Sequence, residues 1–168
     1  MTGSVPHADP YAAVTVAAPG SPEARAVLTA YFHDIVSRYH RRAAVPGEVS
    51  AAMAAEPSDD LCPPHGLFLL ARRDDAVIGC AGLRLLPART GEVTRLFVVP
   101  GARRHGVGKL LLSAVEDAAR QRAVSRLRLD TRSELAEARR LYATNGYQEV
   151  APFNDGRFAD HWYAKTLS

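Results

Sequence analysis

Residues 95–110 of the chain read RLFVVPGARRHGVGKL. An apolar run that favours a β-strand comes first, and Pro100 ends it. A short glycine-bearing loop follows, and from Val107 apolar residues recur at helical spacing as far as Ala118. The segment therefore predicts a strand, a loop and an amphipathic helix in direct succession. The free backbone N–H groups at such a helix start are groups to which anions bind.

Basic residues crowd this predicted helix start, namely Arg103, Arg104, His105 and Lys109. The helix dipole already places partial positive charge there, so each cation is disfavoured by up to about 1 kcal/mol. A bound anion would reverse that cost, and the glycines of the segment would let it approach the backbone closely. The alternative is a solvated basic helix start without a ligand. The segment lacks the Lys-Ser/Thr end of a P-loop and the third glycine of a dinucleotide fingerprint.

Strands and helices alternate along the rest of the chain. Apolar patterns predict strands at residues 12–18, 66–72, 76–86, 91–99, 126–130, 147–151 and 161–165. Helical spacing and capping residues predict helices at residues 21–42, 47–56, from 107 onward, and 131–145. Residues 131–134 (TRSE) have the form of a capping box that would open the last helix. Without a visible repeat or linker, we expect a loose tail at 1–10 and one mixed α/β domain at 11–168.

The composition is that of one globular domain. The chain has 168 residues, of which 47% are hydrophobic and 23% charged, so it can bury a core and is neither disordered nor fibrous. No apolar run approaches the ~20 residues that span a bilayer, and residues 1–10 lack the apolar core of a secretory signal. We therefore expect a cytoplasmic protein without a membrane partner, in which Cys62 and Cys80 stay unpaired.

The charged residues argue against two further kinds of ligand. The net charge is +3 and the basic residues are spread along the chain, so we expect no nucleic-acid partner. His33 and His40 share one face of a predicted helix, but no cysteine or carboxylate completes a metal shell with them. We therefore expect no metal site.

Two motifs together resemble a known family. Residues 103–108 (RRHGVG) match the Gln/Arg-x-x-Gly-x-Gly/Ala signature of the GNAT family of N-acetyltransferases, which bind acetyl coenzyme A. Residues 138–147 (ARRLYATNGY) resemble the second landmark of that family, a helix with Ala-x-x-Leu-Tyr that ends at Gly-Phe/Tyr. The predicted order of elements is also similar, so the resemblance covers nearly the whole chain. It implies a mixed, mostly antiparallel central sheet flanked by helices.

The resemblance implies a site for acetyl-CoA as co-substrate, built from the strand and the helix start. The pantetheine arm would lie along Leu96, Phe97 and Val98, with a backbone N–H of Val98 or a neighbour on the thioester oxygen. The pyrophosphate would rest on the segment made of Arg103, Arg104, His105, Gly106, Val107, Gly108 and Lys109.

The resemblance also implies two catalytic residues. Tyr142 would face the departing sulfur as general acid, since a phenol can protonate a thiolate; the alternative is an aromatic of the core. Glu92 occupies a position similar to that of the base in histone-acetylating relatives. It would take the proton of the amine, unless ordered water does so or Glu92 is only a strand-end acid paired with Arg95 or Arg89.

One position departs from the family pattern, because Leu135 stands where relatives often carry an asparagine that contacts pantetheine. Ser133 or Thr131 could supply a polar contact in its place. In the loop near the C-terminus, Asp155 or Asp160 could attract a cationic amine.

The leading prediction is an enzyme that moves an acetyl group from acetyl-CoA to a primary amine by direct attack in a ternary complex. A small-molecule acceptor is favoured over a polycationic one because acidic residues are few. The residues do not separate a small amine, an amino-acid-like metabolite, an aminoglycoside-type drug and a protein amine. The runner-up is a non-catalytic acyl-CoA-binding module that serves as a sensor or partner. A homodimer is left open.

Overall fold

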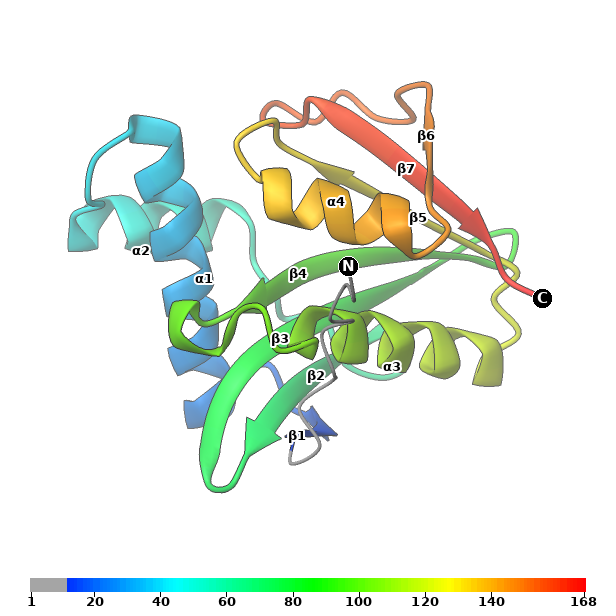
Figure 1. Ribbon diagram of the computed structural model, residues 1–168, viewed down its shortest axis with the longest axis horizontal. Helices are drawn as coiled ribbons and strands as arrows, with labels where there is room; N and C mark the ends of the chain where they lie inside the picture. Colours follow the sequence, from blue (N-terminus) through cyan, green and yellow to red (C-terminus); the bar gives the residue numbers. More distant parts are fainter. Residues whose placement is uncertain (1–11) are drawn as a thin grey trace, which may run out of the picture.

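A seven-stranded sheet in the order β1-β2-β3-β4-β5-β7-β6 forms the centre of the molecule (Figure 1). The computed structural model describes residues 12–168, so the predicted tail at 1–10 lies outside the described part. All neighbouring strands are antiparallel except β4 and β5. The strands are β1 Ala12–Ala17, β2 Gly66–Arg73, β3 Ala76–Leu86, β4 Thr90–Val98, β5 Arg126–Thr131, β6 Gln148–Val150 and β7 His161–Thr166. The helices are α1 Pro22–His40, α2 Pro46–Ala55, η1 Pro100–Ala102, α3 Val107–Gln121 and α4 Ala136–Thr144.

The sheet separates two hydrophobic clusters, and β2 contributes to both. Side chains alternate across a strand, so Leu69 and Ala71 join the cluster that packs under α3 and α4. Phe68 and Leu70 join the cluster under α1. Helices therefore cover both faces, with α3 across the front in Figure 1 and α1 and α2 at the left. The prediction of a mixed α/β fold with a mostly antiparallel sheet flanked by helices is confirmed.

Local sequence signals set most element boundaries as predicted. The Ser21 hydroxyl accepts from the backbone N–H of Ala24 at 3.3 Å and caps α1, and Arg41 ends that helix with φ of 56°. Asp74, with φ of 55°, turns the chain between β2 and β3. The two cysteines are both free thiols. None of the helices within residues 12–168 is long and apolar enough to cross a membrane.

The predicted capping box at 131–134 is wrong, because α4 begins only at Ala136. Thr131 stays in β5, where it pairs with His161 of β7. The backbone N–H of Ser133 donates to Asp160 at 2.9 Å, and the Ser133 hydroxyl lies 3.1 Å from His161 Nε2. The polar groups that could have capped a helix therefore bind β7 and the loop before it, and Leu135 precedes α4 without a side-chain cap.

Lys165 and Glu116 form an ion pair between β7 and α3. Lys165 Nζ donates to Glu116 Oε1 at 2.6 Å and to the carbonyl of Asn145 at 2.9 Å, and the Glu116 side chain is 8% exposed. Lys165→Met is expected to lower the free energy of unfolding by about 3 kcal/mol, because it strands a buried carboxylate. Urea denaturation followed by circular dichroism measures the loss. The double variant Lys165→Met/Glu116→Leu should recover most of it, and equal losses in both variants would contradict this account.

Candidate active site

The parallel pair β4 and β5 separates into a wedge. The two strands pair only over Thr90–Glu92 and Arg126–Arg128. Beyond these residues β4 continues to Val98 and β5 to Thr131 without pairing to each other. In Figure 1 the wedge opens toward the side of the molecule that carries α1 and α2. Backbone groups along the facing strand edges have no ladder partner inside the wedge, so apart from the Val98 carbonyl, which accepts from Arg103, they could pair with another extended molecule.

A bulge lies in the part of β4 that borders the wedge. Thr94 pairs with Gly82 and Phe97 with Cys80, so Arg95 and Leu96 share a single opposite residue. Arg95 has φ of 56°, which is the left-handed region, and such bulges re-aim side chains beside functional sites.

The Arg95 side chain points away from solvent and ties the bulge to the connection after α2. It is 6% exposed and donates to the hydroxyls of Ser58 and Thr94, at 3.2 and 2.9 Å, and to the carbonyl of Glu56 at 3.0 Å. Its guanidinium carbon lies 5.1 Å from the centroid of the Phe32 ring of α1. One buried cation therefore holds α1, the α2–β2 connection and β4 around the same space.

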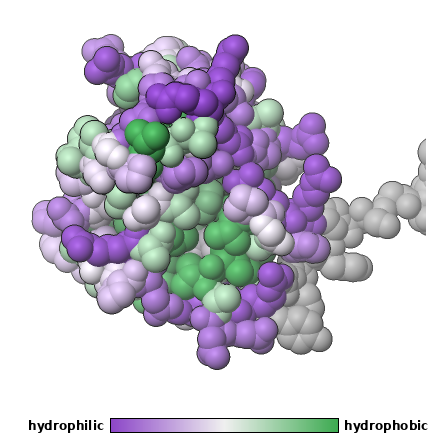
Figure 2. Space-filling view, turned by 90° about the vertical axis from the view of Figure 1, so that its left-hand side faces the viewer, coloured by the Kyte–Doolittle hydropathy of each residue, from purple (hydrophilic) through white to green (hydrophobic). Residues whose placement is uncertain are grey.

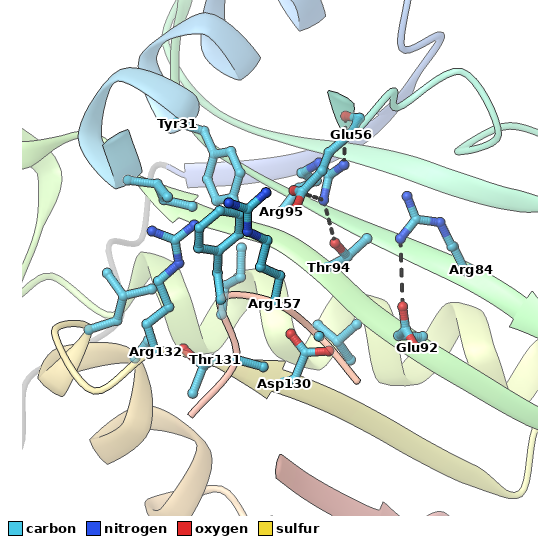
Figure 3. Close-up of a pocket in the computed structure, with 18 of the residues that line it drawn as sticks. Tyr31, Glu56, Arg84, Glu92, Thr94, Arg95, Asp130, Thr131, Arg132 and Arg157 are labelled. Atoms are coloured by element: carbon cyan, nitrogen blue, oxygen red, sulfur yellow. Dashed lines mark hydrogen bonds and ion pairs between the residues drawn. The ribbon is translucent and has the colours of Figure 1, made fainter. Parts of the chain in front are cut away.

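That space is a cavity of about 610 Å³ beside the wedge (Figure 3). Its walls come from α1, the α2–β2 connection, strands β3 to β5, α4 and the loop between β6 and β7. The predicted residues Glu92, Leu96 and Tyr142 all line it. The structure therefore brings both predicted catalytic side chains into one cavity.

Figure 2 shows the face on the left of Figure 1, toward which the wedge opens. Hydrophobic side chains gather in the lower half of this face, and hydrophilic side chains surround them. The molecule thus presents apolar surface on the side where the strands diverge.

Tyr142 belongs both to the core and to the cavity wall. It is 6% exposed, and its ring centroid lies 5.8 Å from that of Tyr147 and 5.9 Å from that of Tyr163. Gly146, with φ of 88°, ends α4 so that the N–H of Tyr147 donates to the carbonyl of Tyr142 at 3.1 Å. Burial raises the pKa of the Tyr142 phenol above its ordinary value, so the hydroxyl is a protonated donor near neutral pH.

Tyr31 of α1 is a second cavity tyrosine, and the sequence did not single it out. It lies among apolar residues at helical spacing, which predicts only a core position. Burial raises its pKa to about 12, and its ring lies 6.1 Å from that of Phe97 at nearly a right angle. The cavity therefore holds two phenols, from α1 and α4, that can donate hydrogen bonds.

Glu92 is engaged by two arginines. Its Oε2 lies 3.3 Å from Arg128 Nε and its Oε1 lies 3.6 Å from Arg84 Nη1 (Figure 3 shows the second contact). These partners come from β5 and β3, and they replace Arg95 or Arg89, which the sequence suggested. The Glu92 side chain is 19% exposed and lines the cavity where the wedge begins, so a substrate amine or a water can reach it.

The connection before α3 offers a row of backbone donors. Within residues 12–168, no protein group accepts a hydrogen bond from the backbone N–H groups of 104–109. Arg104 and Gly106 have φ of 68° and 77°, and the first turn of α3 holds no acidic residue. Successive free N–H groups at a helix start bind phosphate oxygens. The row therefore fits the pyrophosphate of a coenzyme A thioester.

The two sequence motifs touch each other at this helix start. A Cβ added to Gly108 would lie 3.1 Å from Leu141 Cδ2 of α4 and 3.8 Å from Val98 Cγ2 of β4. A side chain at this position would press on Leu141, so the glycine lets α3 begin close to both elements. The row of donors is thereby held next to the open end of the wedge.

The four basic side chains of residues 103–109 have different surroundings. Arg103 Nε donates to the carbonyl of Val98 at 2.9 Å, and its Nη2 lies 3.6 Å from Asp34 of α1. Arg103 thus braces β4 against α1, and its predicted support of the pyrophosphate stays a prediction. Arg104, His105 and Lys109 are exposed beside the row of free N–H groups.

Of the other residues predicted to contact the coenzyme, some line the cavity and some do not. Phe97 is buried in the cluster under α1, whereas Leu96 and Thr131 line the cavity. Leu135 lines it too, so an apolar group stands at the position of the family asparagine. Ser133 is occupied by β7, as described above.

Several cavity residues carried no sequence signal. Asp130 lies near the end of β5, Arg132 directly after that strand, and Arg157 in the loop before β7. Each reads as an ordinary surface charge in the sequence, and only the pairing of β5 with β7 brings them together. Within residues 12–168, no group of three or more histidine, cysteine or acidic side chains could hold a metal ion.

Comparisons with known proteins agree with this architecture. The model of the acetyltransferase (GNAT) family matches residues 30–147. An IAA acetyltransferase of Azospirillum brasilense is 38% identical over 94 residues, which cover 55% of this chain and 61% of that protein. The chain thus matches about three fifths of the length of this curated relative.

Solved structures extend the similarity to nearly the whole chain. A Klebsiella pneumoniae protein assigned as an acyl-CoA N-acyltransferase superposes with a TM-score of 0.72 at 27% identity, covering 94% of this chain and 98% of that one. The PaiA N-acetyltransferase of Thermoplasma acidophilum, solved in complex with coenzyme A, has the same fold, with a TM-score of 0.71 at 18% identity and coverage of 92% and 99%. The resemblance inferred from the two motifs is confirmed. The chain belongs to the acetyltransferase (GNAT) family.

Proposed function

We propose that this chain transfers an acetyl group from acetyl-CoA to the primary amine of a small molecule. The observation that carries the proposal is the row of free backbone N–H groups at 104–109, held by Gly108 beside a wedge that leads to the cavity with Tyr142. A pyrophosphate on this row and an extended arm in the wedge would bring a thioester to the cavity. Family membership supports the same reaction class.

Each part of the site has a distinct task in this proposal. The thioester supplies an acyl carbon that amines can attack. Backbone N–H groups on the unpaired edge of β4 would bind its oxygen, where negative charge develops. The bond from nitrogen to the acyl carbon forms, the bond to sulfur breaks, and the Tyr142 hydroxyl would donate a proton to the departing thiolate. Glu92, directly or through a water, would accept the proton of the amine.

The proposal is tested in two steps on the purified chain. Titration with acetyl-CoA in a calorimeter should give heat and raise the thermal unfolding temperature, because ligands stabilise the state they bind. A thiol-release assay with a panel of primary amines should then show coenzyme A formed in proportion to acceptor. Binding without thiol release for any amine would instead identify an acyl-CoA-binding module. The absence of both heat and stabilisation would overturn the proposed site.

The role of Glu92 has its own signature in the pH dependence. Glu92→Gln is expected to lower kcat/KM for the amine about 100-fold near neutral pH, where the acceptor arrives protonated. The deficit should shrink as pH rises, because an amine that is already deprotonated needs no base. The measurement is the pH profile of kcat/KM for both proteins. Arg128→Gln, which removes one partner of Glu92, is the matched control, and a loss in Glu92→Gln that stays constant with pH would assign Glu92 a structural role.

A further inference from the structure

Four arginines line the cavity, and two of them are matched by acidic partners. Arg84 is ion-paired with Asp60 at 2.7 Å and with Glu92 at 3.6 Å. Arg95 donates to the carbonyl of Glu56 and lies 4.0 Å from its carboxylate. These two cations are therefore neutralised by the protein itself.

The other two, Arg132 and Arg157, are here called the arginine pair. Within residues 12–168, no carboxylate lies within ion-pair distance of either guanidinium group. Arg132 comes from the connection between β5 and α4, and Arg157 from the loop between β6 and β7. Figure 3 shows the two side chains close to each other, on the side of the cavity next to Tyr31.

An aromatic side chain holds the arginine pair in place. The guanidinium carbons of Arg132 and Arg157 lie 4.8 and 5.3 Å from the centroid of the Phe158 ring. Arg132 also lies 5.6 Å from the ring of Tyr39, which itself packs edge-on against Phe158. Stacking on aromatic faces orients a guanidinium group while its N–H donors stay free. The pair is thus positioned by aromatic rings, and among residues 12–168 it has no acidic partner.

Acidic side chains line the same cavity along the wedge. Asp130 and Glu92 come from the two strands of the wedge, and Figure 3 shows Glu92 well apart from the arginine pair, with Asp130 nearer to it. Asp130 accepts from Asn154 Nδ2 through Oδ2 at 2.9 Å, and its second oxygen has no hydrogen-bond donor within residues 12–168. The cavity is therefore positive at one end and negative beside the wedge.

We propose that the acceptor is a small amino-carboxylate, such as an amino acid, whose carboxylate is bound by the arginine pair. This inference rests on the proposed acetyl transfer. Guanidinium groups match carboxylates through paired N–H donors, and two cations in a half-enclosed cavity disfavour a polycationic acceptor. With its carboxylate on the arginine pair, the acceptor would place its amine toward Asp130, Glu92 and the wedge. The volume of about 610 Å³ admits a molecule of this size.

The test compares acids with their amides. Acetyl-CoA is supplied with glycine, β-alanine, L-leucine or L-phenylalanine, or with the matched amide, and coenzyme A release gives kcat/KM. For at least one acid, Arg157→Gln and Arg132→Gln are each expected to lower kcat/KM about 10- to 100-fold. For the matched amide of that acid, kcat/KM should change only about twofold. For each protein, kcat/KM for the acid is divided by kcat/KM for its amide. Dividing this ratio in the variant by the ratio in the wild type cancels the different basicity of the two amines.

Three controls test whether the effect is specific to the arginine pair and to the acceptor. Arg25→Gln removes an exposed arginine of α1 outside the cavity and should leave the ratio unchanged. Arg132→Lys and Arg157→Lys keep the charge and should recover part of the preference, which guards against a loss caused by loop disorder. The KM for acetyl-CoA should stay constant in every variant.

The same assays separate a wrong acceptor class from the absence of acetyl transfer. If amines are acetylated but acids and amides respond alike to the arginine variants, the inferred acceptor class is wrong and the acetyl transfer stands. A rise in the KM for acetyl-CoA alone would assign the arginine pair to the coenzyme and also overturn the inference. If no amine releases coenzyme A, the proposed function itself fails.

Discussion

Replacing Gly106 with valine is expected to weaken acetyl-CoA binding at least about 100-fold while the protein stays folded. Gly106 caps α3 with φ of 77°, a conformation in which a β-branched residue is strongly strained. Relief of that strain must rotate the backbone between Arg104 and Lys109, and the free N–H groups would then no longer converge on one anion. Isothermal calorimetry with acetyl-CoA measures the loss, and circular dichroism checks the fold.

Gly101 supplies a matched control in the same connection. It lies in η1, has no positive φ, and a Cβ added there meets nothing within 4 Å. Gly101→Val should therefore bind acetyl-CoA with wild-type affinity. If Gly106→Val also keeps its affinity, the coenzyme does not use this helix start, and the proposed function loses the observation that carries it.

Tyr142→Phe is expected to lower kcat about 100-fold with little change in acetyl-CoA affinity, because it removes a general acid and keeps the ring. The aromatic contacts to Tyr147 and Tyr163 remain, so stability should change little. Steady-state kinetics and calorimetry separate the two quantities. Because burial raises the pKa of this phenol, the wild-type kcat should show no decline from its ionisation below about pH 10.

Two other tyrosines make this prediction specific. Tyr163 is equally buried and lies 5.9 Å from Tyr142, but it does not line the cavity. Tyr163→Phe should therefore leave kcat near the wild-type value. Tyr31 lines the cavity from α1, and a loss that follows Tyr31→Phe in place of Tyr142→Phe would move the proton donor to α1. An unchanged kcat in Tyr142→Phe would leave Tyr142 a core residue only.

Local patterns predicted the secondary structure well except where distant partners competed. The capping box at 131–134 failed because Asp160 and His161, almost thirty residues later, bind the polar groups of Ser133. A capping motif reports only what nearby residues can offer. The same limit hid the bulge at Arg95, since its sequence continues an ordinary strand pattern and only the register with β3 reveals the extra residue.

Some features of the candidate site were likewise visible in the sequence, and others were not. The glycines at 106 and 146 were visible in the sequence because each meets a local demand of backbone conformation, whereas Gly108 and Tyr142 were visible through the two family motifs. The placement of Glu92 between Arg84 and Arg128, and the unpartnered state of Arg132 and Arg157, were not visible. A surface arginine in a sequence carries no sign of whether a carboxylate will lie beside it.

By itself, the sequence determined the fold class, the order of the elements and the two family motifs, which lie at the start of α3 and in α4. Periodicity and glycine conformation are properties of neighbouring residues, so they survive in a one-dimensional pattern. Only the tertiary structure decided where β4 and β5 part, which side chains share the cavity and which charges remain unmatched. Those properties depend on strand register and on contacts between residues far apart in the chain, and each is settled only when the whole sheet is assembled.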